Sequence, residues 1–331
     1  LFQKLNNYLI FDPLNNKDDV KCFAAVATSL NNAFPHAVRS KNLYNIVIKG
    51  MKNTRQPQTK ALEIPQDKIV ETGIIDIALR DVKGNVRKLT DLKGKVVLVT
   101  GAAGSIGSEL CRQLCHFGLK QLVLFDSAET PMHNIRLELE EKFPDVEFTP
   151  VMGDIRMIHR VESIYQRFHP QLVFHAAAYK HVPLMEENPC EAVHTNVYGT
   201  RNVADMAVKY DVDKFIMVST DKAVNPTNVM GASKRLAEMY VQSLSIAISK
   251  GRQSGKTRFI TTRFGNVLGS NGSVIPRFKE QIENGGPVTV THPDIIRFFM
   301  TIPEACRLVM EAATMGEGNR SEERRVGKEC L

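Results

Sequence analysis

The feature that most constrains the fold of this chain is a glycine-rich run directly after a short apolar strand. Residues 96–100 are apolar and largely β-branched, and Thr100–Gly107 then places glycines at 101, 104 and 107. Glycines at this spacing let the chain turn tightly, bring backbone N–H groups against a pyrophosphate and pack the next helix close to the sheet. A helix beginning near Ser105 and Ile106 would also point its positive end at the anion. The run therefore predicts a dinucleotide-binding βαβ unit.

Acidic residues at the ends of the next two predicted strands fit the same cofactor. Asp126 closes the next strand, 19 residues after Gly107. A carboxylate at that place would accept hydrogen bonds from the adenosine ribose hydroxyls and would repel a 2′-phosphate, which favours NAD while NADP stays a candidate. The alternative for Asp126 is a turn or helix cap. Asp154 and Ile155 follow the third strand and would meet the adenine edge, with an ordinary loop aspartate as the alternative.

From Gly94 onward, strands alternate with helices. Apolar runs predict strands at 96–100, 121–125, 146–151, 172–175, 214–219 and 259–263. Helical spacing predicts helices at 108–117, 131–142, 158–168, 189–210 and 231–250. This alternation is typical of an α/β fold with a doubly wound parallel sheet and right-handed crossovers.

Four segments differ in character. Residues 1–92 mix helix-like and loop-like stretches and contain no catalytic constellation. Residues 93–262 carry the alternating pattern and are predicted to form the nucleotide-binding domain, and 263–319 are predicted to form part of a substrate-binding region. Residues 320–331 resemble the translation of a common sequencing adapter, so we expect them to be non-native; the alternative is a charged, solvated tail.

The distribution of charge and of apolar residues narrows the classes of partner. The net charge of +7 belongs wholly to residues 1–95, and the rest of the chain is balanced. The basic part lacks interleaved aromatic residues, so no nucleic-acid partner is expected. No apolar run approaches the roughly 20 residues that span a bilayer, so no membrane segment is expected in this chain; an anchor would have to precede Leu1.

The six cysteines have no histidine or cysteine partners at metal-ligand spacing, although Cys111 and Cys115 share a helix face. We therefore expect no metal site. Packed free thiols are the expected state, and they are typical of a reducing cytoplasm.

Several longer stretches resemble one enzyme family. They are Thr100–Gly107, His175–Glu186, Ser219–Lys234, Arg263–Gly269 and Gly285–Asp294. These residues are similar to the extended short-chain dehydrogenase/reductases, and more narrowly to the polysaccharide-biosynthesis dehydratases that remove water from UDP-N-acetylglucosamine. The resemblance covers about residues 93–319. It implies a Rossmann domain, an NAD cofactor, a UDP-N-acetylhexosamine substrate and a homo-oligomer.

The resemblance also implies roles for the segment at 219–234. Loss of water across C5 and C6 of a sugar needs an oxidant at C4, a base for the C5 proton and an acid for the C6 hydroxyl. By resemblance, Asp221 would protonate the leaving hydroxyl, Lys222 would take the C5 proton and Thr220 would hold the sugar near C4. The superfamily's Tyr-x-x-x-Lys pair is replaced by Met230 and Lys234, as in the long dehydratases. Lys234 would bind the nicotinamide ribose.

Methionine cannot take the C4 hydroxyl proton. Lys234, Thr220 and a water relay are therefore the candidate acceptors of that proton. The remaining site predictions concern contacts to the cofactor and substrate, and one residue that would hydrogen-bond the backbone. Small side chains would line the approach to the nicotinamide at Ala176, Ala177 and Ala178. Contacts to the substrate are predicted for Lys180, His181, Asn266, Arg277 and Arg297, with surface ion pairs as the alternative for the two arginines. Asn196 is expected to brace backbone.

Two functional alternatives accompany the dehydratase prediction, an epimerase and an inactive fragment. A separate question concerns the origin of the N-terminal segment. A UDP-hexosamine C4 epimerase would use the same C4 oxidation without loss of water, but would be expected to keep the tyrosine. Residues 74–98 resemble the opening of thioredoxin-like, redoxin-type proteins, which suggests a chimera joined near 92–98. An unusual native N-terminal domain is the alternative to that junction, and an inactive nucleotide-binding fragment is the third functional candidate.

Overall fold

The structure is a computed structural model that describes residues 79–80, 86–87, 92–270, 272, 274–289, 299–315 and 321–322. It divides into two compact units, Leu1–Lys88 and Leu89–Leu331. In the first unit, β1 (Leu79–Arg80) pairs antiparallel with β2 (Val86–Arg87).

The second unit is built on a seven-stranded sheet in the order β11-β8-β7-β6-β3-β4-β5, and every neighbouring pair in it is parallel. The strands are β3 (Val96–Thr100), β4 (Gln121–Asp126), β5 (Phe148–Met152), β6 (Leu172–His175), β7 (Lys214–Thr220), β8 (Arg258–Phe264) and β11 (Ser321–Glu322). Chain order runs outward in one direction from β3 and in the other from β6. Ligands of such sheets bind at this switch point, beyond the carboxyl ends of the strands.

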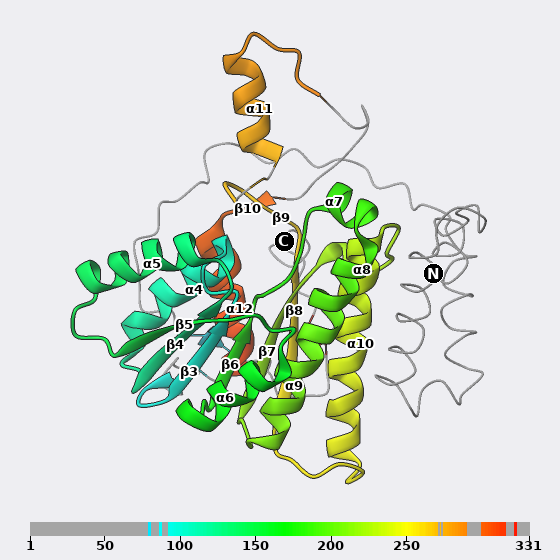
Figure 1. Ribbon diagram of the computed structural model, residues 1–331. Coiled ribbons are helices and arrows are strands. Elements are labelled where there is room, and N and C mark those ends of the chain that lie inside the picture. The colour runs from blue at the N-terminus through cyan, green and yellow to red at the C-terminus, as the bar shows by residue number, and fades with distance from the viewer. Residues whose placement is uncertain are drawn as a thin grey trace, which may run out of the picture. The chain divides into compact units, whose positions relative to one another are not determined.

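Helices cover both faces of the sheet (Figure 1). The helices of this unit are α4 (Ser105–Leu114), α5 (Glu129–Lys142), α6 (Ile158–Phe168), α7 (Val182–Glu187), α8 (Pro189–Ala192), α9 (Thr200–Lys209), α10 (Val229–Ser249), α11 (Val274–Glu283) and α12 (Ile302–Met315). Helices α4, α5 and α12 share one buried apolar cluster with the central strands, whereas α6, α9 and α10 pack together on the opposite face. The predicted doubly wound α/β fold is confirmed.

The burial of β3 explains its composition. All five residues of β3 are buried, because helices cover both sides of the strand, and such strands read as continuous apolar runs. The largest fully buried side chains include Leu98, Phe125 and Phe174 on the three central strands. A second small sheet pairs β9 (Asn266–Val267) in parallel with β10 (Phe299–Met300).

The structure differs from the sequence predictions in three places. The helix predicted over 189–210 contains a π-helical segment, Val193–Gly199, between α8 and α9. Residues Ser321 and Glu322, for which no strand was predicted, form β11 beside β8. Cys111, Cys115 and Cys306 are buried free thiols as expected, but Cys190 is disulfide-bonded.

The described part of the chain lacks two kinds of feature. None of its helices is both long and apolar enough to cross a bilayer. No group of three or more His, Cys, Asp or Glu side chains within it could hold a metal ion.

Candidate functional site

The glycine-rich loop connects β3 to α4 at the switch point of the sheet. Gly101 has φ +71°, and a Cβ built on it would lie 2.5 Å from the backbone nitrogen of Ala177. A Cβ on Gly107 would lie 2.6 Å from the carbonyl carbon of Gly101 and 2.8 Å from the Cα of Ala102. At both positions the opposing atoms are backbone and cannot rotate away. Sterics therefore account for these glycines, and the loop is as tight as a phosphate cradle requires.

The N-terminus of α4 faces this loop. Gly104 is the N-cap residue, and no side chain caps the helix. A Cβ on Gly104 would lie 3.3 Å from the carbonyl oxygen of Gly101, which is tight but tolerable. What this end offers a ligand is therefore backbone N–H groups and the positive end of the helix dipole.

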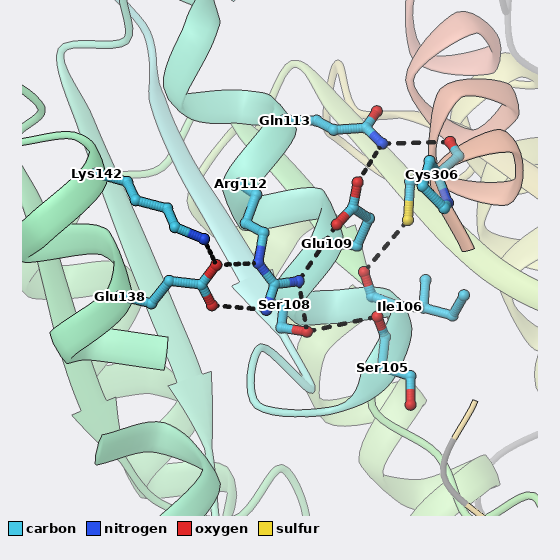
Figure 2. A network of polar contacts seen from close by, with 10 residues as sticks. Ser105, Ile106, Ser108, Glu109, Arg112, Gln113, Glu138, Lys142 and Cys306 are labelled. Atoms are coloured by element: carbon cyan, nitrogen blue, oxygen red, sulfur yellow. Dashed lines mark hydrogen bonds and ion pairs between the residues drawn. The ribbon is translucent and has the colours of Figure 1, made fainter. Parts of the chain in front are cut away.

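Ionic and thiol contacts fix α4 on both sides (Figure 2). Arg112 donates two parallel hydrogen bonds to Glu138 on α5, each 2.8 Å long, and Lys142 donates another of 2.8 Å. The Arg112 guanidinium, assisted by Lys142 and opposed by partial burial, lowers the pKa of Glu138 to about 2. On the other side, the Cys306 thiol of α12 donates to the carbonyl oxygen of Ile106 at 3.4 Å. The helix that carries the cradle is thus held between α5 and α12.

Asp126 lies at the end of β4, and its carboxylate touches the cradle. Oδ2 accepts a hydrogen bond from the backbone N–H of Ala103 at 2.9 Å, and Oδ1 accepts one from Ala128 at 3.0 Å. The carboxylate therefore accepts hydrogen bonds from backbone N–H groups, as expected if Asp126 is a turn or helix-cap residue. Each oxygen still has a lone pair for a ribose hydroxyl, so the cofactor role stays a prediction.

Asp154 follows β5 and is held by Arg156. Its carboxylate accepts hydrogen bonds of 2.8 Å from the backbone N–H and from Nε of Arg156, which also bonds Glu191 at 2.7 Å. Partial burial alone would raise the pKa of Asp154, but the hydrogen bonds from Arg156 outweigh it and the pKa is lowered. Ile155 is buried, and a Cβ on Gly199 would lie 2.6 Å from its Cγ1. Asp154 is thus a fixed anion.

The loop after β6 lies against the cradle. The N–H of Ala176 donates to the carbonyl oxygen of Thr100 at 3.0 Å, and the backbone at Ala176 and Ala177 faces Gly101. Further on, the Asn196 side chain accepts from the Tyr179 N–H at 2.8 Å and donates to the Tyr179 carbonyl oxygen at 3.0 Å. The expectation that Asn196 braces backbone is confirmed.

Lys180 and His181 complete this loop, after Ala178. Burial lowers the pKa of Lys180. Burial, followed by the charge of Lys180, lowers the pKa of His181. The imidazole of His181 lies against Gly272, where an added Cβ would meet the ring. The side chain of His181 therefore borders the loop that begins after β9.

Thr220, Asp221 and Lys222 lie together at the carboxyl end of β7, where a 3₁₀ turn begins. The Thr220 hydroxyl donates to Asp221 Oδ1 at 2.9 Å, and Lys222 Nζ donates to the same oxygen at 3.2 Å. Lys222 Nζ also lies 3.4 Å from Asn266 Oδ1. The Asp221 and Lys222 side chains are 52% and 32% exposed, so a ligand can reach both. The structure thus brings four of the predicted site residues into one bonded group.

Helix α10 packs directly on this turn. Asn228 caps the helix by accepting from the Gly231 N–H at 2.8 Å, and Glu186 accepts from the Val229 N–H at 2.7 Å. A Cβ on Gly231 would overlap the carbonyl oxygen of Lys222, so glycine is what permits the contact. The start of α10 and the Asp221–Lys222 turn are therefore held as one body.

The first turns of α10 carry Met230 and Lys234. Met230 is buried in an apolar cluster with Met185 and Ala192. Lys234 Nζ donates to the carbonyl oxygen of Val218 at 2.7 Å. Burial, partly offset by Glu238, lowers the pKa of Lys234 to about 8. A buried cation with spare N–H donors beside the end of β7 is placed to hold hydroxyl groups.

One predicted substrate residue that the structure describes, Arg277, is not bonded to this group. Arg277 is exposed on α11, and among the described residues no hydrogen bond or ion pair joins it to the other predicted site residues. Arg297 lies outside the described residues. Conversely, the contributions of Arg156 and Glu186 were not predicted from the sequence. Arg156 bonds Glu191 and Glu186 bonds the Val229 N–H, and these partners are distant in the chain and are brought together only by the fold.

Comparisons with known proteins agree with this geometry. The sequence profile of a family described as polysaccharide biosynthesis protein matches residues 97–328. The capsular polysaccharide biosynthesis protein CapD of Staphylococcus aureus is 48% identical over 280 residues, which cover 84% of this chain and 45% of CapD. A UDP-glucose 4-epimerase of Rickettsia rickettsii is 40% identical over 67% of this chain and 63% of its own length. Among solved structures, Pen from Bacillus thuringiensis superposes with a TM-score of 0.64 at 37% identity, covering 71% of this chain and 69% of Pen.

These alignments bear on the predicted segments at both ends. Residues 93–331 make up less than three quarters of the chain, so an alignment that covers 84% of it continues into the N-terminal segment. The junction near 92–98 and the redoxin-like origin find no support there, and the profile match reaches residue 328, within the supposed adapter. The chain spans less than half the length of the S. aureus relative. It belongs to the polysaccharide biosynthesis protein family.

Proposed function

We propose that this chain carries the catalytic domain of an NAD-dependent 4,6-dehydratase of UDP-N-acetylhexosamines. The observation that carries the proposal is the pair Asp221 and Lys222, bonded at 3.2 Å at the carboxyl end of β7. An acid and a base side by side are what elimination across two adjacent carbons requires, and the parallel sheet presents them where its ligands bind.

The residues at the switch point fit a dinucleotide. Gly101 and Gly107 leave no room for side chains, α4 presents an uncapped N-terminus, and Asp126 stands beside the loop with lone pairs to spare. Lys234, whose Nζ donates to the carbonyl oxygen of Val218, would hold the nicotinamide ribose. When bound, NAD would accept the hydride from C4 of the sugar and return it to C6. The carboxylate of Asp126 favours NAD over NADP.

The chain's own groups account for the proton transfers. Oxidation at C4 acidifies the C5 proton, and Lys222 would take that proton while Asp221 gives one to the departing C6 hydroxyl, releasing water. The C5 position would then regain a proton as the hydride arrives at C6. Thr220, which donates to Asp221 at 2.9 Å, would hold the C4 oxygen. Met230 has no proton to exchange, so Thr220, Lys234 or a water must accept the C4 hydroxyl proton.

A C4 epimerase is the second candidate, since the Rickettsia relative at 40% identity bears that name. Epimerisation needs a proton acceptor for the C4 hydroxyl in both directions, but no acid for C6. The Asp221–Lys222 pair favours the dehydratase, and so does Met230, because an epimerase would be expected to keep a tyrosine at that position. A UDP-sugar substrate favours a cytoplasmic location, and a homo-oligomer stays the expected assembly.

The test is to incubate the purified chain with UDP-N-acetylglucosamine and NAD and to resolve the products by chromatography and mass spectrometry. The proposal predicts a product lighter by one water, which Asp221→Asn and Lys222→Met abolish. Matched controls at exposed positions, Asp145→Asn and Lys250→Met, keep full activity. An isomer of equal mass would move the assignment to the epimerase. Unchanged substrate would favour an inactive nucleotide-binding fragment.

A further inference from the structure

His175 is a buried titratable group to which the proposed chemistry gives no role. It closes β6, is fully buried, and is the register partner of Thr100 at the end of β3. These two strands flank the switch point of the sheet. A polar ring in such a position is costly unless its nitrogens are hydrogen-bonded, and both of them are.

The hydrogen bonds around His175 fix its tautomer. The Thr200 hydroxyl donates to the carbonyl oxygen of Asn196 at 2.7 Å, because a carbonyl can only accept. Toward His175 Nε2, at 2.8 Å, Thr200 must therefore act as acceptor, so Nε2 carries the proton. In a neutral ring Nδ1 is then an acceptor, and the Thr100 hydroxyl donates to it at 2.7 Å. All donors in this chain of bonds point the same way.

This chain of bonds continues to the helix that carries Lys234. The Asn196 amide, which clasps Tyr179, also donates from Nδ2 to the Ser233 hydroxyl at 2.9 Å. Ser233 in turn donates to the carbonyl oxygen of Met230 at 2.8 Å. A buried polar chain thus runs from the end of β3, through the π-helical segment, to the first turn of α10.

The hydrogen bond between Thr100 and the His175 imidazole joins the last residues of β3 and β6. Each of these residues leads directly into one of the two loops that would enclose the cofactor. Thr100 precedes Gly101, and His175 precedes Ala176. The backbones of these loops touch, since a Cβ on Gly101 would lie 2.5 Å from Ala177 N. A contact so close leaves little tolerance for relative movement of β3 and β6, and the imidazole is the side-chain link between their ends.

We propose that His175, as the neutral Nε2–H tautomer, is a positioning residue that keeps the two cofactor-contacting loops in register and couples them to α10. The proposal rests on the proposed function for the identity of the cofactor. Burial, followed by the charge of Lys234, lowers the pKa of His175 to about 3. The ring therefore stays neutral at physiological pH and acts through fixed geometry, not through titration.

The tautomer can be measured without any cofactor. Nitrogen-15 NMR of histidine-labelled protein distinguishes protonated from unprotonated ring nitrogens, and His175→Phe identifies the resonances that belong to this ring. We expect a protonated Nε2 and a bare Nδ1 that do not change between about pH 5 and about pH 9. A proton on Nδ1, or a ring that titrates in this range, would overturn the proposal.

The positioning role is tested by NAD affinity, measured by calorimetry well below the unfolding temperature. His175→Phe removes both hydrogen bonds and should raise the dissociation constant about 10-fold, as expected for buried hydroxyls left unpaired. Thr100→Val and Thr200→Val should each weaken binding less, and their effects should not add, because both act through one ring. His133→Gln, at an exposed position on α5, is the control and should bind NAD as the wild type does.

The outcomes separate this proposal from the proposed function. A wild-type chain that binds NAD, with His175→Phe and the two threonine variants less stable but equal in affinity, would overturn the positioning role alone. If His175→Phe does not fold, Thr100→Val, which keeps the ring, carries the test. A wild-type chain that does not bind NAD would overturn the proposed cofactor, and the tautomer measurement then decides the inference.

Discussion

Replacing Gly107 by alanine should damage the cradle and the fold together. On helix propensity alone the change would stabilise α4 by about 1 kcal/mol. The new Cβ, however, would lie 2.6 Å from the carbonyl carbon of Gly101 and 2.8 Å from the Cα of Ala102. These are backbone atoms, so helix and loop must separate, and overpacking of this kind costs about 1–3 kcal/mol. We expect a net loss of up to about 2 kcal/mol, because the clash outweighs the propensity gain.

Gly104→Ala is the matched comparison within the same loop. Its Cβ would lie 3.3 Å from the Gly101 carbonyl oxygen, so the fold should tolerate it, whereas a phosphate approaching the loop would meet the methyl group. Thermal unfolding and NAD titration separate the two effects, with about 2–4 °C per kcal/mol for a domain of this size. Gly107→Ala should lower both the unfolding temperature and the NAD affinity, and Gly104→Ala mainly the affinity. A Gly107→Ala protein as stable as wild type with unchanged NAD affinity would refute the steric argument.

Three further predictions concern charged groups. Asp221→Asn and Lys222→Met should each lower turnover at least about 100-fold and leave the NAD affinity unchanged. Steady-state kinetics and NAD titration measure the two quantities, and a loss of NAD affinity would contradict the assignment of these residues to the substrate. Because Arg112 lowers the pKa of Glu138 from 4.5 to about 2, the pair stabilises the fold above pH 4.5 and less as pH falls toward 2. Arg112→Leu should therefore unfold at a lower temperature at neutral pH, and its difference from wild type should shrink across that window. Since burial lowers the pKa of Lys234 to about 8, NAD affinity should fall as pH rises through 8, and Lys234→Met should bind more weakly without that dependence.

The parts of the fold that the sequence predicted are those governed by local pattern. The strands at 96–100 and 172–175 match β3 and β6 residue for residue, because both are buried on two faces and read as continuous apolar runs. The cradle was predictable from glycine spacing alone, since Gly101 and Gly107 have no steric alternative. The Asp221–Lys222 pair was found through a family resemblance, whereas the contact between Lys222 Nζ and Asn266 Oδ1, 3.4 Å apart, was not predicted.

The parts that the sequence did not predict depend on contacts between distant residues. The sequence left open whether Asp126 caps backbone or faces a ribose, and the structure shows its carboxylate bonded to two backbone N–H groups. The π-helical segment at 193–199 interrupts a helix whose apolar spacing looks regular. The bond from Thr100 to His175 spans 75 residues, and it becomes visible only when β3 and β6 are neighbours. No pattern of spacing within either strand indicates it.

The most direct test of the account is the reaction of UDP-N-acetylglucosamine with this chain and NAD in heavy water, with the product returned to ordinary water before analysis. The account predicts a sugar nucleotide that has lost one water and carries one deuterium at C5, where solvent replaces the proton taken by Lys222. Its C6 methyl group should contain no deuterium, because that hydrogen comes from C4. A product with the mass of the substrate and no deuterium would contradict the account and identify an epimerase.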